Sequence, residues 1–172
     1  MSFDSFEKSA LLLSLSRWRA PQPVAPARPG TVFNATQYGA TCPQAISSTL
    51  YTQQNEDCLN LNVWAPAEGS NLPVFVYMYG GAMVTGSSSN PGLQGNNFAR
   101  KDVVFVSFNT RESIFAYPNS AELGKTGSQN FGILDVEKAL EWVQKNIAGS
   151  FTFSRICRLE ILLMNECDSF WW

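Results

Sequence analysis

The chain has 172 residues, 45% of them hydrophobic and 13% aromatic, which is enough apolar material for one domain with a buried core and excludes a disordered chain. Its 12 basic and 14 acidic residues give a formal net charge of -2 without long runs, which argues against a nucleic-acid partner. Histidine is absent, so a Ser-His-Asp or Cys-His mechanism within this chain is excluded.

The N-terminal segment contains one short apolar stretch, residues 10–15. Asp4 and Glu7 precede it, where a secretory signal peptide carries positive charge, and no clear small-residue cleavage site follows. We therefore expect no signal peptide in this chain. No apolar run approaches the roughly 18–20 residues of a membrane span, so we also expect no transmembrane segment. The proline-rich stretch 21–29 predicts an extended surface segment.

Three strands are predicted before residue 110. Residues 59–65 alternate between apolar residues and asparagine, which predicts a strand with one polar face near a sheet edge. Residues 73–79 and 103–108 are almost continuously apolar and rich in β-branched and aromatic residues, which is typical of strands buried on both faces of a parallel sheet. The Gly/Ser/Asn-rich stretch 85–97 predicts a loop, with a short helix near Phe98.

A helix is predicted over residues 131–147, where apolar residues recur at spacings of three, four and seven. Asn130 or Ser128 is suited to cap its start, and Gly149 to end it. Strand, glycine turn, loop, strand and helix in this order predict an α/β fold with a doubly wound sheet.

Four cysteines are present, and none of them forms the C-x-x-C pair of a zinc site. Without histidine a Cys/His metal site is impossible, so we expect no metal and no cofactor. A structural disulfide is the better use for some of the cysteines, which are Cys42, Cys58, Cys157 and Cys167.

Several strings along the chain, taken in order, resemble the type B carboxylesterases and cholinesterases, a family with the α/β-hydrolase fold. They are Arg17-Trp-Arg-Ala-Pro-Gln-Pro, Tyr38-Gly, Cys42-Pro-Gln, Glu56-Asp-Cys-Leu-Asn-Leu-Asn-Val-Trp, Val76-Tyr-Met-Tyr-Gly-Gly-Ala, Asn109-Thr-Arg, Asn130-Phe-Gly-Ile-Leu-Asp and Leu140-Glu-Trp-Val-Gln-Lys-Asn-Ile. The resemblance implies a partial family domain over residues 17–148, preceded by a non-matching segment, 1–16.

The resemblance implies an oxyanion hole at Gly81 and Ala82, with Gly80 in the turn. In such a site, adjacent backbone N–H groups stabilise the negative oxygen that develops on an ester carbonyl. Glycine allows the backbone shape, whereas alanine, which stands where many relatives carry a third glycine, narrows the allowed dihedral angles. An ordinary strand-to-loop glycine turn is the alternative for this segment. The implied substrate is a small carboxylic ester.

The resemblance also implies three structural features. Cys42 and Cys58 match family positions that form a disulfide; two buried free thiols are the alternative if the chain stays in the cytosol. Two partly buried ion pairs tie loops to the sheet. Their members are Arg17 with Glu56 and Arg111 with Asp135. Asn34 lies in an Asn-x-Thr sequon, so the resemblance favours a secreted, glycosylated protein, although no signal peptide is evident.

The chain departs from the family after Ala148. The family needs a nucleophilic serine in a Gly-x-Ser-x-Gly elbow, an acidic residue and a histidine. None of these is present, and residues 149–172 read as an unrelated tail; a frame change or retained intron in the predicted gene would explain the junction. We therefore expect a truncated α/β-hydrolase fold, with a mostly parallel sheet lacking the nucleophile-elbow strand and the C-terminal half.

A sheet halted before that strand is expected to have an unpaired apolar edge that favours aggregation, partly covered at most by a helix around Ile161. Three functional hypotheses remain. The first is a catalytically incomplete esterase, inactive alone; the second is a non-catalytic cholinesterase-like binding or adhesion module, whose protein partner the sequence does not identify. The third is a fragment completed in trans by another chain.

Overall fold

Four strands form one mixed sheet in the order β1-β3-β2-β4. The computed structural model describes residues 17–22, 36–45, 52–69, 71–125 and 129–147, and the backbone of residues 159–162. The strands are β1 (Leu61–Trp64), β2 (Val74–Tyr77), β3 (Val104–Phe108) and β4 (Leu159–Leu162). β2 pairs in parallel with β3 and with β4, whereas β1 pairs antiparallel with β3. The α/β class and a sheet with more parallel than antiparallel pairs are therefore confirmed.

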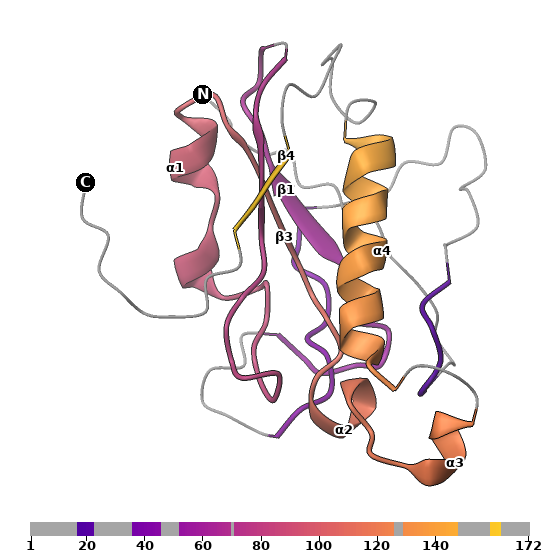
Figure 1. Cartoon of the computed structure of the whole chain (residues 1–172). Coiled ribbons are helices and arrows are strands. Elements are labelled where there is room, and N and C mark those ends of the chain that lie inside the picture. Colours follow the sequence, from indigo (N-terminus) through magenta and orange to yellow (C-terminus); the bar gives the residue numbers. More distant parts are fainter. Residues whose placement is uncertain are drawn as a thin grey trace, which may run out of the picture.

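Helices lie on both sides of this sheet (Figure 1). The short helix α1 (Asn96–Ala99), predicted near Phe98, lies on one side, and the long helix α4 (Phe131–Asn146) lies on the other. Three further short elements are η1 (Pro91–Leu93), α2 (Ser113–Ala116) and α3 (Ala121–Gly124). Asn130 occupies the N-cap position of α4, but the helix ends with Ile147 as its C-cap residue; Gly149 and Ser128 lie outside the described residues.

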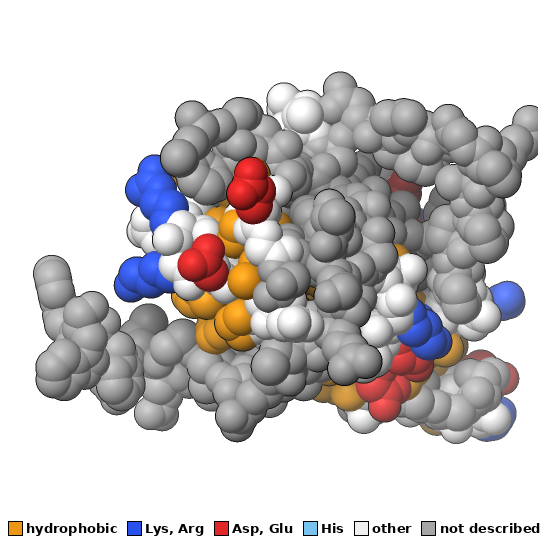
Figure 2. All heavy atoms as spheres, turned by 90° about the horizontal axis from the view of Figure 1, so that it is seen from above, with side chains coloured by type: hydrophobic (Ala, Val, Ile, Leu, Met, Phe, Trp, Pro, Cys, Tyr) orange, Lys and Arg blue, Asp and Glu red, His pale blue; other side chains and the backbone are white. Residues whose placement is uncertain are grey.

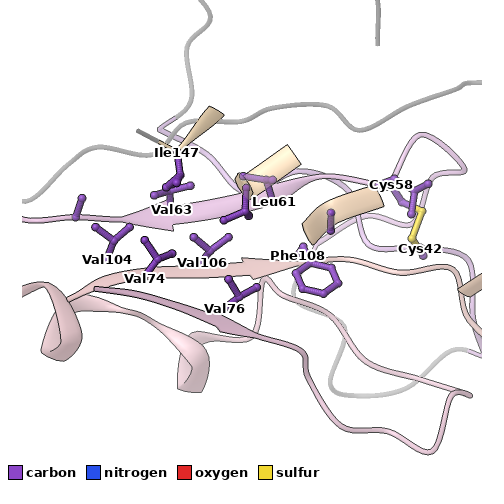
Figure 3. Close-up of a cluster of buried hydrophobic side chains, with 14 residues drawn as sticks. Cys42, Cys58, Leu61, Val63, Val74, Val76, Val104, Val106, Phe108 and Ile147 are labelled. Atoms are coloured by element: carbon purple, nitrogen blue, oxygen red, sulfur yellow. A yellow bond between two sulfur atoms is a disulfide. The ribbon is translucent and has the colours of Figure 1, made fainter. Parts of the chain in front are cut away.

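Alternate residues of the strands build two apolar clusters. On the α4 side, side chains from β1, β2 and β3 pack with Ala139, Val143 and Ile147 of the helix segment; the strand residues are Leu61, Val63, Val74, Val76, Val104, Val106 and Phe108 (Figure 3). On the α1 side, Trp64, Phe105 and Ala99 form the second cluster. The period of two along each strand therefore separates the two cores.

The asparagine face of β1, predicted as the polar face of this strand, is buried. Asn62 is 5% exposed, and its side-chain amide donates to Ser88 Oγ at 3.0 Å and to Ser107 Oγ at 3.3 Å. β1 lies at the edge of the sheet, as predicted. Asn62 is accommodated inside the molecule because hydroxyls of the loop residue Ser88 and the β3 residue Ser107 accept its N–H groups.

The edge of β2 is paired, so the prediction of an unpaired edge is wrong. β4 lies parallel to β2, with Val74 opposite Leu159 and Val76 opposite Ile161. The tail around Ile161 is thus a strand and not a helix. A main chain of any sequence can satisfy the hydrogen-bonding groups of a strand edge, which is why residues outside the family resemblance can fill this position.

Charged side chains are dispersed among the described residues. On the face seen from above, acidic and basic side chains lie in small groups beside each other (Figure 2). Three ion pairs on the surface join neighbouring or nearby turns of helices; they are Lys125 with Glu122, and Lys138 and Lys145 with Glu141. No helix in the described ranges has the length and apolarity needed to span a bilayer.

Candidate functional site

Two segments that follow the parallel strands β2 and β3 form the candidate site. Because β2 and β3 are parallel, their carboxyl ends lie at the same edge of the sheet. Residues 79–86 follow β2, and residues 109–113 follow β3. A backbone hydrogen bond joins the two segments, from the N–H of Ser113 to the carbonyl oxygen of Met83 at 2.9 Å.

The loop after β2 has an unusual backbone. Gly81, Ala82 and Met83 have φ angles of 150°, 53° and 62°. A side chain at Gly81 would overlap the carbonyl oxygen of Thr85, so only glycine fits there. Around Gly80, by contrast, the space for a side chain is open. Ala82 and Met83 lie in the left-handed region, which disfavours residues with a Cβ atom.

This backbone leaves two consecutive amides available. The N–H groups of Val84 and Thr85 donate to the carbonyl oxygen of Gly81, at 3.0 and 3.3 Å, and close the turn. Within the described part of the chain, the N–H groups of Gly81 and Ala82 donate to no protein acceptor. Gly81 is half-buried and Ala82 is exposed, so both amides are accessible to a ligand oxygen.

Gln44 fixes the far end of the loop. Its side-chain oxygen accepts hydrogen bonds from the N–H of Gly86 at 2.8 Å and from Thr85 Oγ1 at 2.5 Å, and its side-chain nitrogen donates to the carbonyl oxygen of Gly86 at 2.7 Å. Cys42 and Cys58 form the disulfide implied by the resemblance, which is therefore confirmed, with a Cα–Cα distance of 4.8 Å. The disulfide thus anchors the segment that carries Gln44.

A buried acid lies beside the other end of the loop. Glu112 is 3% exposed, and its Oε1 accepts hydrogen bonds from the Tyr79 hydroxyl at 2.9 Å and the Thr110 hydroxyl at 3.1 Å. Burial raises the pKa of Glu112 to about 7; the two hydroxyls oppose the rise and the negative charge of Asp135 adds to it. Burial also raises the pKa of Tyr79, so its hydroxyl stays protonated as a donor.

A pocket opens between this acid, the loop and α4. Its polar lining comes from Tyr79, Thr85, Thr110, Glu112 and Tyr117, and its apolar lining comes from the helix and the loop. The apolar side chains are Met78, Met83, Ile133 and Val136, beside the backbone of Gly81. Polar groups that converge beside apolar side chains are common in small-molecule sites.

The pair Arg111 and Asp135 ties the segment after β3 to α4. Arg111 donates three hydrogen bonds to the carboxylate, from its backbone N–H at 3.0 Å, from Nε at 2.9 Å and from Nη2 at 2.6 Å. The two side chains are 11% and 1% exposed. Burial raises the pKa of Asp135, and the hydrogen bonds and charge of Arg111 oppose that rise.

The pair Arg17 and Glu56 is present but exposed, which corrects the expectation of partial burial. The side chains are 56% and 41% exposed, and Arg17 Nε donates to Glu56 Oε2 at 2.7 Å. The hydrogen bond from Arg17 lowers the pKa of Glu56. Both side chains line a second pocket with Arg19, Arg111 and Phe115.

The serines of the loop before η1 have a structural role. Ser87, Ser88 and Ser89 are buried, and the hydroxyls of Ser87 and Ser89 lie 2.7 Å apart. The N–H of Ser88 donates to Asn109 Oδ1 at 2.8 Å. These contacts hold the loop, which was predicted within residues 85–97, against the sheet.

Two residues of the site were not identified from the sequence. Gln44 belongs to a quoted motif but received no role, and Glu112 belongs to none. The only available signal for Glu112 was an acid in the short segment after a buried strand. The sequon residue Asn34 and the tail residues 149–158 and 163–172 lie outside the described residues. In the described ranges, no cluster of three acidic or cysteine side chains is placed to hold a metal ion.

Comparisons with known proteins identify relatives of this chain. Residues 13–151 match the model of the Carboxylesterase family. The chain is 38% identical to para-nitrobenzyl esterase of Bacillus subtilis over 141 residues, which is 78% of this chain and 29% of that protein. It is 36% identical to cholinesterase of Mus musculus, with 77% of this chain and 24% of that protein covered.

A third relative is lipase 2 of Geotrichum candidum. It is 43% identical over 121 residues, which is 62% of this chain and 21% of the lipase. The chain therefore spans about a quarter of the length of the curated relatives it matches.

Proposed function

Because the chain belongs to the carboxylesterase family, we propose that it carries the oxyanion-binding segment of a carboxylic ester hydrolase and that these 172 residues alone do not hydrolyse esters. The observation that supports the first part is the pair of accessible, consecutive amides at Gly81 and Ala82 after the carboxyl end of β2, where Gly81 also lines the pocket. Gly80 supplies the turn that precedes them.

The chemistry follows from where charge develops. When a nucleophile attacks an ester carbonyl, the carbonyl oxygen becomes negative, and fixed N–H donors stabilise it more than they stabilise the substrate. Removal of one such donor costs roughly 10²–10³ in kcat. A small carboxylic ester with an apolar portion suits the pocket lined by Met78, Met83 and Ile133.

The second part of the proposal rests on what this sequence lacks. A serine hydroxyl is a weak nucleophile without an adjacent base, and the chain has no histidine to serve as one. It also has no Gly-x-Ser-x-Gly elbow, and the described serines that resemble it, Ser87, Ser88 and Ser89, are buried. Within these 172 residues, therefore, no serine has a histidine beside it to act as its base.

The test grafts this chain into a complete relative. Residues 17–147 replace the matching segment of the Bacillus subtilis esterase, and turnover of a short-chain chromogenic ester is measured. We expect turnover, and we expect Ala82→Pro, which removes one N–H donor, to lower kcat by roughly 10²–10³ with little change in KM.

Two matched variants separate donor loss from backbone disruption. Ala82→Gly keeps the N–H and should keep kcat. Met83→Pro imposes the same conflict with a positive φ angle but removes an amide that is not assigned as a donor. If Met83→Pro lost as much kcat as Ala82→Pro, or if Ala82→Pro retained kcat, the assignment of the Ala82 amide would be wrong.

A second candidate is a non-catalytic binding module of the cholinesterase type. The pairing of β4 with β2 favours it, because this strand occupies a sheet edge that would otherwise be open. A self-contained module predicts a monomer with one cooperative unfolding transition, measured by size-exclusion chromatography and urea denaturation. Aggregation of purified protein would contradict it.

Secretion remains part of the proposal. The disulfide between Cys42 and Cys58 suits an oxidising compartment, since such bonds are rare in the cytosol. Alkylation of free thiols in protein isolated from its source, followed by mass spectrometry, should leave these two cysteines unmodified; their alkylation without prior reduction would contradict secretion.

A further inference from the structure

The buried acid Glu112 has no part in the chemistry proposed above. It lies in the segment 109–113 that follows β3, and it is 3% exposed. No ion pair joins it to a lysine or arginine within the described ranges, since the neighbouring Arg111 is bound to Asp135. Burying a carboxyl group without a cation costs free energy, which suggests a functional role for Glu112. The groups that form hydrogen bonds with it indicate that role.

Those partners connect Glu112 to the loop with the two accessible amides. Its Oε1 accepts the hydroxyl of Tyr79, the residue directly before Gly80. The Tyr79 hydroxyl in turn accepts the N–H of Thr110 at 3.2 Å. The Tyr79 ring lies against Gly86, where any added side chain would overlap it. Tyr79 is therefore fixed at its hydroxyl by Glu112 and at its ring by the far end of the loop.

The backbone after Glu112 contacts the middle of the same loop. The N–H of Ser113 donates to the carbonyl oxygen of Met83 at 2.9 Å, and Ser113 itself has a φ angle of 53°. This hydrogen bond places Glu112 beside the loop. A backbone held in the left-handed region persists only where its surroundings stabilise it.

We propose that Glu112 is a positioning residue for the Gly80–Met83 loop, which it holds through the Tyr79 hydroxyl in the conformation that leaves the amides of Gly81 and Ala82 available. The role of those amides as oxyanion donors is the proposed function, on which this inference rests. Glu112 acts through Tyr79 and transfers no proton to or from a substrate.

The charge state of Glu112 affects this contact. The polar and charged groups that face it are Tyr79, Thr110, Tyr117 and Asp135, the last of them paired with Arg111. When ionised, the carboxylate accepts both hydroxyls as charge-assisted hydrogen bonds. When protonated, it is neutral and one of its oxygens becomes a donor, so its hold on Tyr79 weakens. With a pKa raised to about 7 by burial, this change falls near neutral pH.

The experiment follows the backbone amides of the full 172-residue chain by ¹⁵N–¹H NMR between pH 5.5 and 8.5. We expect the signals of Gly81 and Ala82 to shift with an inflection near pH 7. Glu112→Gln should abolish this inflection. Glu141→Gln, which changes an exposed acid of α4 in the same way, should leave it intact.

Tyr79→Phe separates positioning from a direct field effect. It removes the hydroxyl and leaves the charge of Glu112 beside the loop, so the inflection at the two amides should be lost while the Glu112 carboxyl carbon still titrates. An inflection that persists in Tyr79→Phe or in Glu112→Gln, or one absent from the wild type, would overturn the proposal. This measurement does not depend on ester turnover. A negative NMR result would therefore overturn the role of Glu112 without bearing on the proposed function, and absence of turnover would not affect the NMR result.

Discussion

Removing the carboxylate of Asp135 should destabilise the fold more than any exposed charge change. Asp135 receives three hydrogen bonds from Arg111, and the side chains are 1% and 11% exposed. Asp135→Ala leaves the guanidinium buried without its counter-charge. Loss of one partner of a buried pair costs about 3–5 kcal/mol, which corresponds to a fall in Tm of roughly 6–20 °C for a chain of this size.

The assay is urea unfolding followed by circular dichroism, with the m-value compared between variants to show that the unfolding transition itself is unchanged. Glu141→Ala is the matched control on the same helix, because Glu141 accepts from Lys138 and Lys145 at the surface. Such exposed pairs contribute at most about 1 kcal/mol. The reasoning would be refuted if Asp135→Ala cost no more than Glu141→Ala.

A double variant shows whether the loss comes from the unpaired charge. Replacing Arg111 with Met and Asp135 with Ala together removes both charges. We expect this variant to be more stable than Asp135→Ala alone, because no charge is then left buried without a partner. If the loss of unfolding free energy in the double variant equalled the sum of the losses in the two single variants, the two side chains would act independently.

Three other substitutions have defined outcomes. Replacing Cys42 and Cys58 with Ala opens a loop between residues 16 apart and should cost about 3 kcal/mol in urea unfolding, whereas an unchanged midpoint would show that the bond contributes nothing. Ala82→Gly relieves a φ angle of 53° and should stabilise the fold by about 1 kcal/mol; a loss of stability would contradict the strain. Glu112 has a folded-state pKa of about 7, above its ordinary 4.5, so the folded state takes up a proton between these values and stability should fall by about 3 kcal/mol as pH rises through that window. Glu112→Gln should flatten this pH dependence, and a wild-type stability that rises over the same window would show that the sign is wrong.

The main elements could be predicted from periodicity because each depends on its own residues. Alternation located β1, continuous apolar runs located β2 and β3, and helical spacing located α4. The helix near Phe98 and the edge position of β1 were also predicted correctly. The short helices α2 and α3 were not predicted, because four residues give no periodic pattern.

The remaining features depend on contacts between distant segments. The buried face of Asn62 requires the hydroxyl of Ser88, 26 residues away, so alternation alone could not show that the polar face is buried. Pairing of β4 with β2 depends on main-chain groups and leaves little trace in the side chains. The exposure of Arg17 and Glu56 likewise depends on which other segments of the chain pack over them. The resemblance did not specify those segments.

The candidate site was predicted in part. The resemblance located Gly80, Gly81 and Ala82, and the structure adds the positive φ angles and accessible amides of Gly81 and Ala82. It gave no role to Gln44 or Glu112, which hold the two ends of the loop. Hydrogen bonds between side chains and a distant backbone have no fixed spacing in the sequence, so motif order could not reveal them.

Reaction with a fluorophosphonate ester analogue tests the central claim most directly. The full 172-residue protein is incubated with the reagent and analysed by intact-mass and peptide mass spectrometry. Because the chain keeps amides for a developing oxyanion but contains no histidine to activate a serine, we predict no covalent adduct. A stable phosphonyl adduct on any of its serines would contradict this account.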